Sequence, residues 1–228
     1  MQEVIEEEQE MSTYILVHGT WLGGWSWSGI TERLGAAGHV VEAPTLAGDG
    51  TLGSHVDEVV AIIDAHSGEE IILVGHSYGG MVIAGASSSR PTAVREAVFL
   101  DAFMPEAGQS AFDVIPVVRP LFEAGAAESG DGNVPPFDMS MFGLEPALGD
   151  PIAARLRPWP LVTHTEQSPG MPVTVRGSFL LCAESPFFAE LAAQLENRGW
   201  KLARPSVGHM APITHPDVIF DALVGLRD

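Results

Sequence analysis

The sequence predicts a doubly wound α/β fold, in which a mostly parallel sheet carries helices on both faces. Two observations lead to this prediction: short apolar runs rich in β-branched residues alternate with helical patterns, and these runs lack the polar alternation of a half-exposed strand. A chain of 228 residues that is 46% hydrophobic can bury one sizeable core. Ligands of such sheets bind beyond the carboxyl ends of the strands.

The expected elements follow from the apolar spacing along the chain. The first strand, at 13–17, is apolar and β-branched throughout. A helix is expected over 27–37, because Trp27, Ile30 and Leu34 recur at helical spacing before Gly38. A second helix follows around 56–63, and a third directly after residue 79. Further strands are expected at 40–44, 71–75, 96–100, 177–182 and 200–203, and further helices at 187–197 and 217–226.

One long stretch breaks this alternation. Prolines interrupt short apolar pieces between residues 105 and 171, and a stretch of this length inside a compact domain is usually a functional insertion. We expect an inserted helical cap at 105–171, because its many aromatic and aliphatic residues are too apolar to stay solvated. The rest of the chain is expected to divide into an acidic, disordered N-terminus at 1–12 and a core formed by 13–104 and 172–228.

Charge and cysteine content narrow the class of protein. Eleven Lys and Arg against 30 Asp and Glu give a formal net charge of -19, which argues against nucleic-acid and anionic membrane partners. The single Cys182 excludes an internal disulfide and a cysteine-based metal cluster. No apolar run approaches the length of a membrane span, and the acidic opening is unlike a signal peptide. We therefore expect a cytoplasmic protein with no metal and no cofactor; a homodimer is compatible with the sequence.

The stretch 71–80 contains the strongest functional motif. An apolar strand leads into Gly75-His76-Ser77-Tyr78-Gly79, a Gly-x-Ser-x-Gly sequence, and a run of small residues follows as a helix. A serine in such a sharp turn needs small residues two positions before and after it, and glycine occupies both positions. We predict that Ser77 is a nucleophile whose hydroxyl is presented to substrate.

A serine nucleophile needs a histidine base and a carboxylate that holds the imidazole. His209 is the predicted base, because it follows the last strand in a Gly-His loop near the C-terminus. Two carboxylates follow strand ends that approach this position: Asp101, directly after a strand, and Glu184, two residues after the next one. We favour Asp101 and keep Glu184 as the alternative acid.

Oxyanion stabilisation requires backbone N–H donors. The glycine-rich loop after the first strand offers Thr20, and the start of the helix after Ser77 offers Tyr78. Among the other histidines, we expect His18 to support the first loop and His164 to be the one that could line the cap. The substrate pocket is expected to have apolar walls, formed by Trp21, Phe103, Met104, Phe112, Phe122, Trp159 and Met210.

Four segments, at 18–27, 75–80, 99–105 and 208–210, together resemble the α/β-hydrolase superfamily, most closely the plant methylesterase and hydroxynitrile lyase family. The resemblance runs from about residue 13 to the end. It implies that Ser77 is the nucleophile, that His209 is the base, and that Thr20 and Tyr78 supply the oxyanion amides. The lyases of this family carry a threonine where this chain has Gly19 and a lysine where it has Met210, so the resemblance favours the esterase side.

The chain departs from that family at the acid. The family's aspartate follows the strand that ends near Cys182, where this chain has Ala183, Glu184 and Ser185. Asp101 instead resembles the acid position of haloalkane dehalogenases and of zearalenone lactonase, which follows the earlier strand. The dehalogenases themselves have an aspartate where this chain has Ser77.

These features predict a cofactor-independent serine carboxylesterase that hydrolyses small, neutral, apolar or aromatic esters. A lactonase or a C–C bond hydrolase would use the same triad on a different substrate. A receptor that binds a small ligand on a hydrolase scaffold is an alternative from another class. Fold alone does not distinguish the three.

Overall fold

The structure, a computed structural model, describes residues 11–227 and contains a six-stranded parallel sheet. Its strand order is β2-β1-β3-β4-β7-β8, so the chain starts near the middle, winds to one edge and then crosses to the other. All of these strands pair in parallel, as the alternating pattern predicts. The strands are β1 (Thr13–Val17), β2 (Val40–Glu42), β3 (Ile71–His76), β4 (Val94–Leu100), β7 (Arg176–Leu180) and β8 (Lys201–Ala203).

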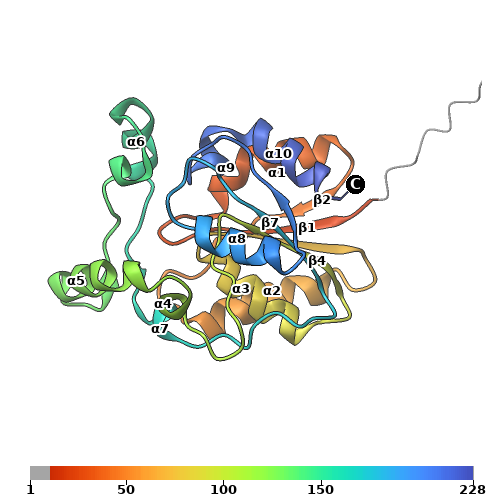
Figure 1. The fold of residues 1–228 in the computed structure, drawn as a ribbon, viewed down its shortest axis with the longest axis horizontal. Coiled ribbons are helices and arrows are strands. Elements are labelled where there is room, and N and C mark those ends of the chain that lie inside the picture. The colour runs from red at the N-terminus through yellow and green to blue at the C-terminus, as the bar shows by residue number, and fades with distance from the viewer. Residues whose placement is uncertain (1–10, 228) are drawn as a thin grey trace, which may run out of the picture.

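Helices cover both faces of this sheet (Figure 1). On one face α1 (Ser28–Ala36) and α10 (Pro216–Gly225) enclose a buried cluster that includes Leu34, Leu16 and Leu223. On the other face α2 (Leu52–Ala65), α3 (Gly79–Ser89) and α8 (Ala189–Asn197) enclose a larger cluster. The fold is therefore a three-layer α/β sandwich, as predicted, with the central strands buried on both sides.

The turn between β3 and α3 depends on close backbone approaches. A Cβ at Gly75 would lie 2.6 Å from the carbonyl oxygen of Gly79, and one at Gly79 would lie 2.3 Å from that of Val17. A Cβ at Gly80 would lie 2.0 Å from the carbonyl oxygen of Phe103. Glycine is thus required here by space, because the start of α3 is pressed between the ends of β1 and β4.

The segment between β4 and β7 leaves the sheet and forms short helices beside the carboxyl ends of the strands (Figure 1). Prolines begin several of its elements, where a missing N–H is tolerated. A small antiparallel pair, which the sequence did not predict, joins β5 (Asn133–Val134) to β6 (Trp159–Pro160). The helices are α4 (Ala111–Val114), η2 (Pro116–Val118), α5 (Arg119–Ser129), η3 (Met139–Phe142), α6 (Pro146–Ala153) and α7 (Val162–Thr165).

The structure revises the start of one predicted helix and describes only part of the predicted N-terminus. Helix α8 begins at Ala189 rather than at residue 187, and the two residues before it, Phe187 and Phe188, belong to the preceding turn. Of the predicted N-terminus at 1–12, residues 1–10 lie outside the described residues, whereas Ser12 is already buried in the core. Within residues 11–227, no helix is both long and apolar enough to cross a membrane.

The glycine packing predicts opposite effects for two alanine substitutions. Gly80→Ala should lower the free energy of unfolding by about 1–3 kcal/mol, because the new Cβ overlaps the Phe103 carbonyl. Gly35→Ala, at an exposed position of helix α1 with no atom within 4 Å of the added Cβ, should leave stability unchanged or raise it by about 0.5–1 kcal/mol. Urea unfolding followed by circular dichroism measures both, and equal stability of the two variants would contradict this account.

Candidate active site

Backbone strain is concentrated at three residues that follow central strands. Among the described non-glycine residues, only Trp21, Ser77 and Asp101 have positive φ angles, of 66°, 53° and 42°. They follow the ends of β1, β3 and β4, which lie side by side in the sheet. Such conformations cost about 1–3 kcal/mol each and persist where the surrounding structure enforces them. The strained residues therefore mark the carboxyl edge of the sheet as the candidate site.

The structure brings His209 and Asp101 together. Nδ1 of His209 lies 2.6 Å from Oδ2 of Asp101, and both side chains are buried. The other carboxylate oxygen, Oδ1, accepts the backbone N–H of Cys182 at 3.3 Å. Glu184, the alternative acid, is exposed and has no recorded side-chain contact with His209. Of the two carboxylates considered from the sequence, Asp101 is thus the one that contacts the imidazole.

Further contacts orient the loop that carries His209. Nε2–H of His76 donates to the carbonyl oxygen of His209 at 2.9 Å. Burial lowers the pKa of His76 well below its usual range, so this side chain is a neutral structural donor. The imidazole of His209 stacks on the rings of Phe142 and Phe188, with centroids 5.6 and 6.0 Å away, and meets Phe187 edge-on at 5.2 Å. The imidazole is therefore held in one orientation by three aromatic rings.

The first loop places Thr20 beside Ser77. Gly19 has no space for a side chain, because a Cβ there would lie 2.9 Å from Cβ of Ser77. His18 supports the loop, as expected: its ring bonds the carbonyl of Gly19 at 2.8 Å and accepts the N–H of Leu46 at 3.1 Å. Burial lowers the pKa of His18 to about 4. No hydrogen bond recorded among the described residues takes the backbone N–H of Thr20 or of Tyr78.

A largely apolar pocket opens at these residues. Its empty volume, including the mouth, is about 780 Å³. Ser77 and His209 both line it, and none of the described residues in its wall is Asp, Glu, Lys or Arg. The side chains of Ser77 and His209 therefore face a neutral and largely apolar pocket. Its wall consists of Gly19, Thr20, Trp21, Leu22, His76, Ser77, Phe103, Ile115, Val118, Leu121, Phe122, Phe137, Met139, Met141, Phe142, Leu156, Phe187, Phe188, His209 and Met210.

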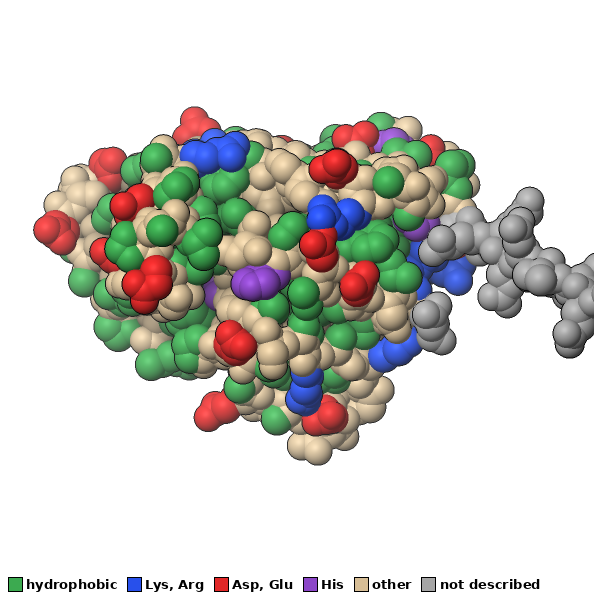
Figure 2. Space-filling model, turned by 90° about the horizontal axis from the view of Figure 1, so that it is seen from above, with side chains coloured by type: hydrophobic (Ala, Val, Ile, Leu, Met, Phe, Trp, Pro, Cys, Tyr) green, Lys and Arg blue, Asp and Glu red, His purple; other side chains and the backbone are tan. Residues whose placement is uncertain are grey.

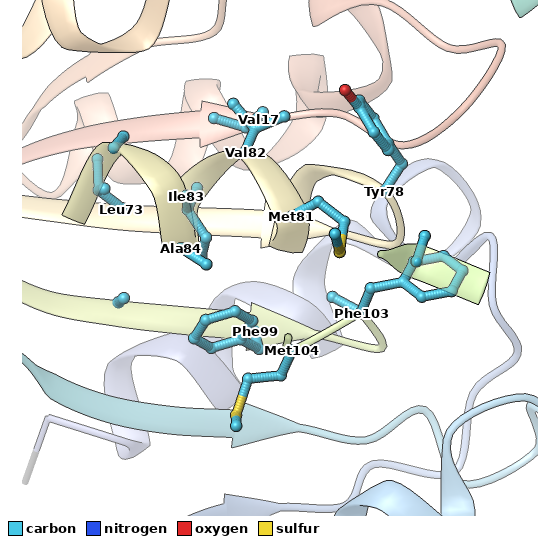
Figure 3. Close-up of a cluster of buried hydrophobic side chains, with 14 of the residues drawn as sticks. Val17, Leu73, Tyr78, Met81, Val82, Ile83, Ala84, Phe99, Phe103 and Met104 are labelled. Carbon is cyan, nitrogen blue, oxygen red and sulfur yellow. The ribbon is translucent and has the colours of Figure 1, made fainter. Parts of the chain in front are cut away.

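Four of the predicted wall residues line this pocket: Trp21, Phe103, Phe122 and Met210. The other three do not, and the prediction for them is corrected here. Met104 belongs to the core, where Figure 3 shows it beside Phe99. Phe112 packs behind the wall against the ring of Phe122, and Trp159 is fully buried against His18, His55 and Tyr78. Each of the three is apolar and buried, but none of them lines the pocket.

Several residues around the site had no role in the sequence analysis, or, like His164, a different one. Phe187 and Phe188 contact the imidazole of His209, and the adjacent aromatic pair directly after a strand-end turn was the available signal. His164 lies behind the wall and bonds Thr20 instead of lining the inserted segment. His55 bonds the hydroxyl of Tyr78. Among residues 11–227, no cluster of His, Cys, Asp or Glu could hold a metal ion.

Comparison with known proteins identifies similar sequences over most of the chain. The model of the alpha/beta hydrolase family matches residues 14–222. A carbendazim hydrolyzing esterase from Nocardioides sp. (strain SG-4G) is 31% identical over 248 residues, which cover 95% of this chain and 100% of that protein. Methyl jasmonate esterase 1 of Vitis vinifera is 38% identical over 109 residues, or 43% of this chain and 42% of that protein.

Comparison with solved structures shows the same fold. An extracellular alpha/beta-hydrolase from a Paenibacillus species superposes with a TM-score of 0.85 and 25% identity, covering 95% of this chain and 100% of that one. It is described as sharing structural and functional homology with Tobacco Salicylic Acid Binding Protein 2. The similarity thus extends over the sheet and the inserted segment alike.

The packing around Asp101 predicts an inert cysteine. Cys182 is fully buried, and burial, with the nearby Asp101 carboxylate, raises the pKa of its thiol. A disulfide reagent such as DTNB should therefore leave the native protein unmodified over the time in which it titrates one thiol per chain in urea. Rapid modification of the native protein would show that the region around Asp101 opens readily.

Proposed function

The chain belongs to the alpha/beta hydrolase family, and from that premise we propose that it is a serine carboxylesterase whose nucleophile is Ser77. One observation carries the proposal: a strained serine shares an apolar pocket with a histidine whose Nδ1 is bonded to the buried Asp101. The relatives named as esterases support ester-bond hydrolysis as the reaction. The hydrogen bond at Nδ1 leaves Nε2 of His209 as the atom that takes the serine proton.

In the proposed reaction, Nε2 of His209 accepts the Ser77 proton while Oγ attacks the ester carbonyl carbon. The carbonyl oxygen becomes an oxyanion that accepts hydrogen bonds from the backbone N–H groups of Thr20 and Tyr78. The C–O bond to the alcohol then breaks, and His209 protonates the departing oxygen. Water attacks the acyl-enzyme with the same base, and the acid is released while Ser77 regains its proton.

The pocket supports a neutral substrate. Charged side chains are absent from the described part of its wall, and an ion buried there would lack a partner. We propose small apolar or aromatic esters, with the segment 105–171 acting as a cap that supplies much of the wall. Lactones or C–C bonds of similar polarity are the alternative substrates, since the same groups would act on them. The lone buried cysteine fits a reducing compartment, and we propose that the protein is cytoplasmic.

A second candidate function is ligand binding without turnover. It draws on one relative, Salicylic acid-binding protein 2 of Nicotiana tabacum, which is 39% identical over 42% of its length. A strained Ser77 in the same pocket as an oriented His209 favours catalysis, because a receptor needs neither. Tight binding of an apolar acid, together with equal ester turnover by wild type and Ser77→Ala, would favour the receptor.

Substitution of the triad tests the reaction. Hydrolysis of short p-nitrophenyl esters should fall to background in Ser77→Ala. Asp101→Asn should reduce kcat by about 10⁴-fold, because the imidazole loses its orienting acceptor. The matched control Glu184→Gln, on an exposed side chain, should stay within about twofold of wild type. A loss in Glu184→Gln with Asp101→Asn unaffected would assign the acid to the later strand.

The pocket also predicts a charge preference. p-Nitrophenyl butyrate and p-nitrophenyl hemisuccinate have acyl chains of similar length, but only the second carries a carboxylate. The kcat/KM of the hemisuccinate should be at least about 100-fold lower, since burying an unpaired charge costs several kcal/mol. Comparable steady-state rates for the two esters would refute a neutral substrate class.

A further inference from the structure

The two residues whose amides would bind the oxyanion have a further feature in common. Each carries a hydroxyl, and each hydroxyl is hydrogen-bonded to a buried histidine: Oγ1 of Thr20 to Nε2 of His164 at 3.1 Å, and the phenol of Tyr78 to Nδ1 of His55 at 2.9 Å. Neither histidine lines the pocket. The reaction described above uses neither of them.

The first hydrogen-bond chain runs from Thr20 through His164 and Thr163 to Pro160. The carbonyl group at its end decides which atom donates in each of its hydrogen bonds. The carbonyl oxygen of Pro160 can only accept, so the hydroxyl of Thr163 donates to it at 2.7 Å. Nδ1–H of His164 must then donate to Thr163 Oγ1 at 2.9 Å. A neutral imidazole has one donor and one acceptor, so its Nε2 accepts the hydroxyl proton of Thr20. The chain runs without a gap from Thr20 to the backbone of the inserted segment.

The second hydrogen-bond chain also runs from a hydroxyl group through a histidine to a backbone carbonyl. Nε2–H of His55 donates to the carbonyl oxygen of Ala47 at 2.8 Å. Nδ1 is therefore an acceptor and receives the phenol proton of Tyr78. This chain connects the residue after the nucleophile to helix α2 and to the loop that precedes it.

Burial keeps both imidazoles neutral, as these directions require. Burial lowers the pKa of His164 to about 3, and the pKa of His55 below its usual value. Both side chains are fully buried. The rings of Tyr78 and His164 also stack, with centroids 5.1 Å apart, so the two chains contact each other. An imidazolium at either position would donate from both nitrogens and could not accept the hydroxyl proton.

We propose that His164 and His55 are positioning residues that hold the oxyanion-binding amides of Thr20 and Tyr78 through the hydroxyl groups of those two residues. The inference rests on the proposed function, because it assigns a role to groups around the same oxyanion. Oxyanion donors act strongly only when they are fixed before charge develops. Thr20 lies in an irregular loop beside the strained Trp21, so its own backbone does not fix the direction of its N–H.

The test removes each hydroxyl and keeps each amide. Thr20→Val and Tyr78→Phe preserve shape and the backbone N–H, and His164→Phe and His55→Phe remove the acceptors. Each variant should lower kcat for p-nitrophenyl butyrate about tenfold or more, with KM within about twofold. Thr20→Ser and His164→Gln, which retain a hydroxyl and an acceptor, should recover most of the loss. The Ki of a trifluoromethyl ketone, which forms a tetrahedral adduct, should rise in parallel with the loss of kcat, whereas the Ki of an unreactive ether analogue should not.

Two further comparisons separate positioning from general destabilisation. His39→Phe is the control, since His39 is a buried neutral histidine packed on Tyr14 outside the pocket, and it should leave kcat unchanged. The double variant Thr20→Val/His164→Phe should be no slower than the slower single variant, because both changes break one hydrogen bond.

Two results would reject the inference in different ways. Unchanged kcat in Thr20→Val and Tyr78→Phe, with activity still dependent on Ser77, would reject the positioning role and leave the esterase standing. Equal activity of wild type and Ser77→Ala would reject the proposed function itself, and the positioning role with it.

Discussion

The close approach of backbone at the start of α3 is the constraint on which the site depends. Gly79 and Gly80 let the helix begin in contact with the ends of β1 and β4, and this contact forces Ser77 into a left-handed conformation. The strain is local, but three packed strands sustain it. The same contact brings the residues after β1, β3 and β4 to a single point. The strain at Ser77 and the convergence of these three strand ends thus follow from one packing arrangement.

Parallel strand order explains how distant residues meet. β3 and β4 are neighbours, so Ser77 and Asp101 emerge at the same edge of the sheet. Cys182, two residues after the end of the adjacent strand β7, donates its backbone N–H to the Asp101 carboxylate. The loop after β8 then carries His209 back over this edge. Because Asp101 follows the strand adjacent to the one that precedes Ser77, the turn after β7 does not supply the carboxylate that contacts His209. It contributes Phe187 and Phe188, whose rings contact the imidazole.

The inserted segment contributes apolar surface to the pocket and a hydrogen-bond network behind it. Its aromatic side chains form much of the neutral wall, while His164 of α7 bonds Thr20 in the first loop. Several of its apolar side chains remain exposed, namely Val117, Leu121, Met141 and Leu148. Seen from above, apolar and acidic side chains are interspersed over this part of the molecule (Figure 2). The segment therefore connects the wall of the pocket to the loop after β1 that carries Thr20.

The sequence by itself determined the alternation of strands and helices, the serine turn and the histidine loop, because these depend on local periodicity and on glycine at sterically crowded positions. It favoured Asp101 and kept Glu184 as the alternative acid, since both follow strand ends, and only the tertiary structure shows which carboxylate contacts the imidazole. It also misplaced Trp159, Phe112 and Met104, because composition indicates that a segment is apolar but not which side chains face the pocket. The hydrogen-bond chains through His55 and His164 depend on residues 23 and 144 positions apart, and only tertiary packing brings these together.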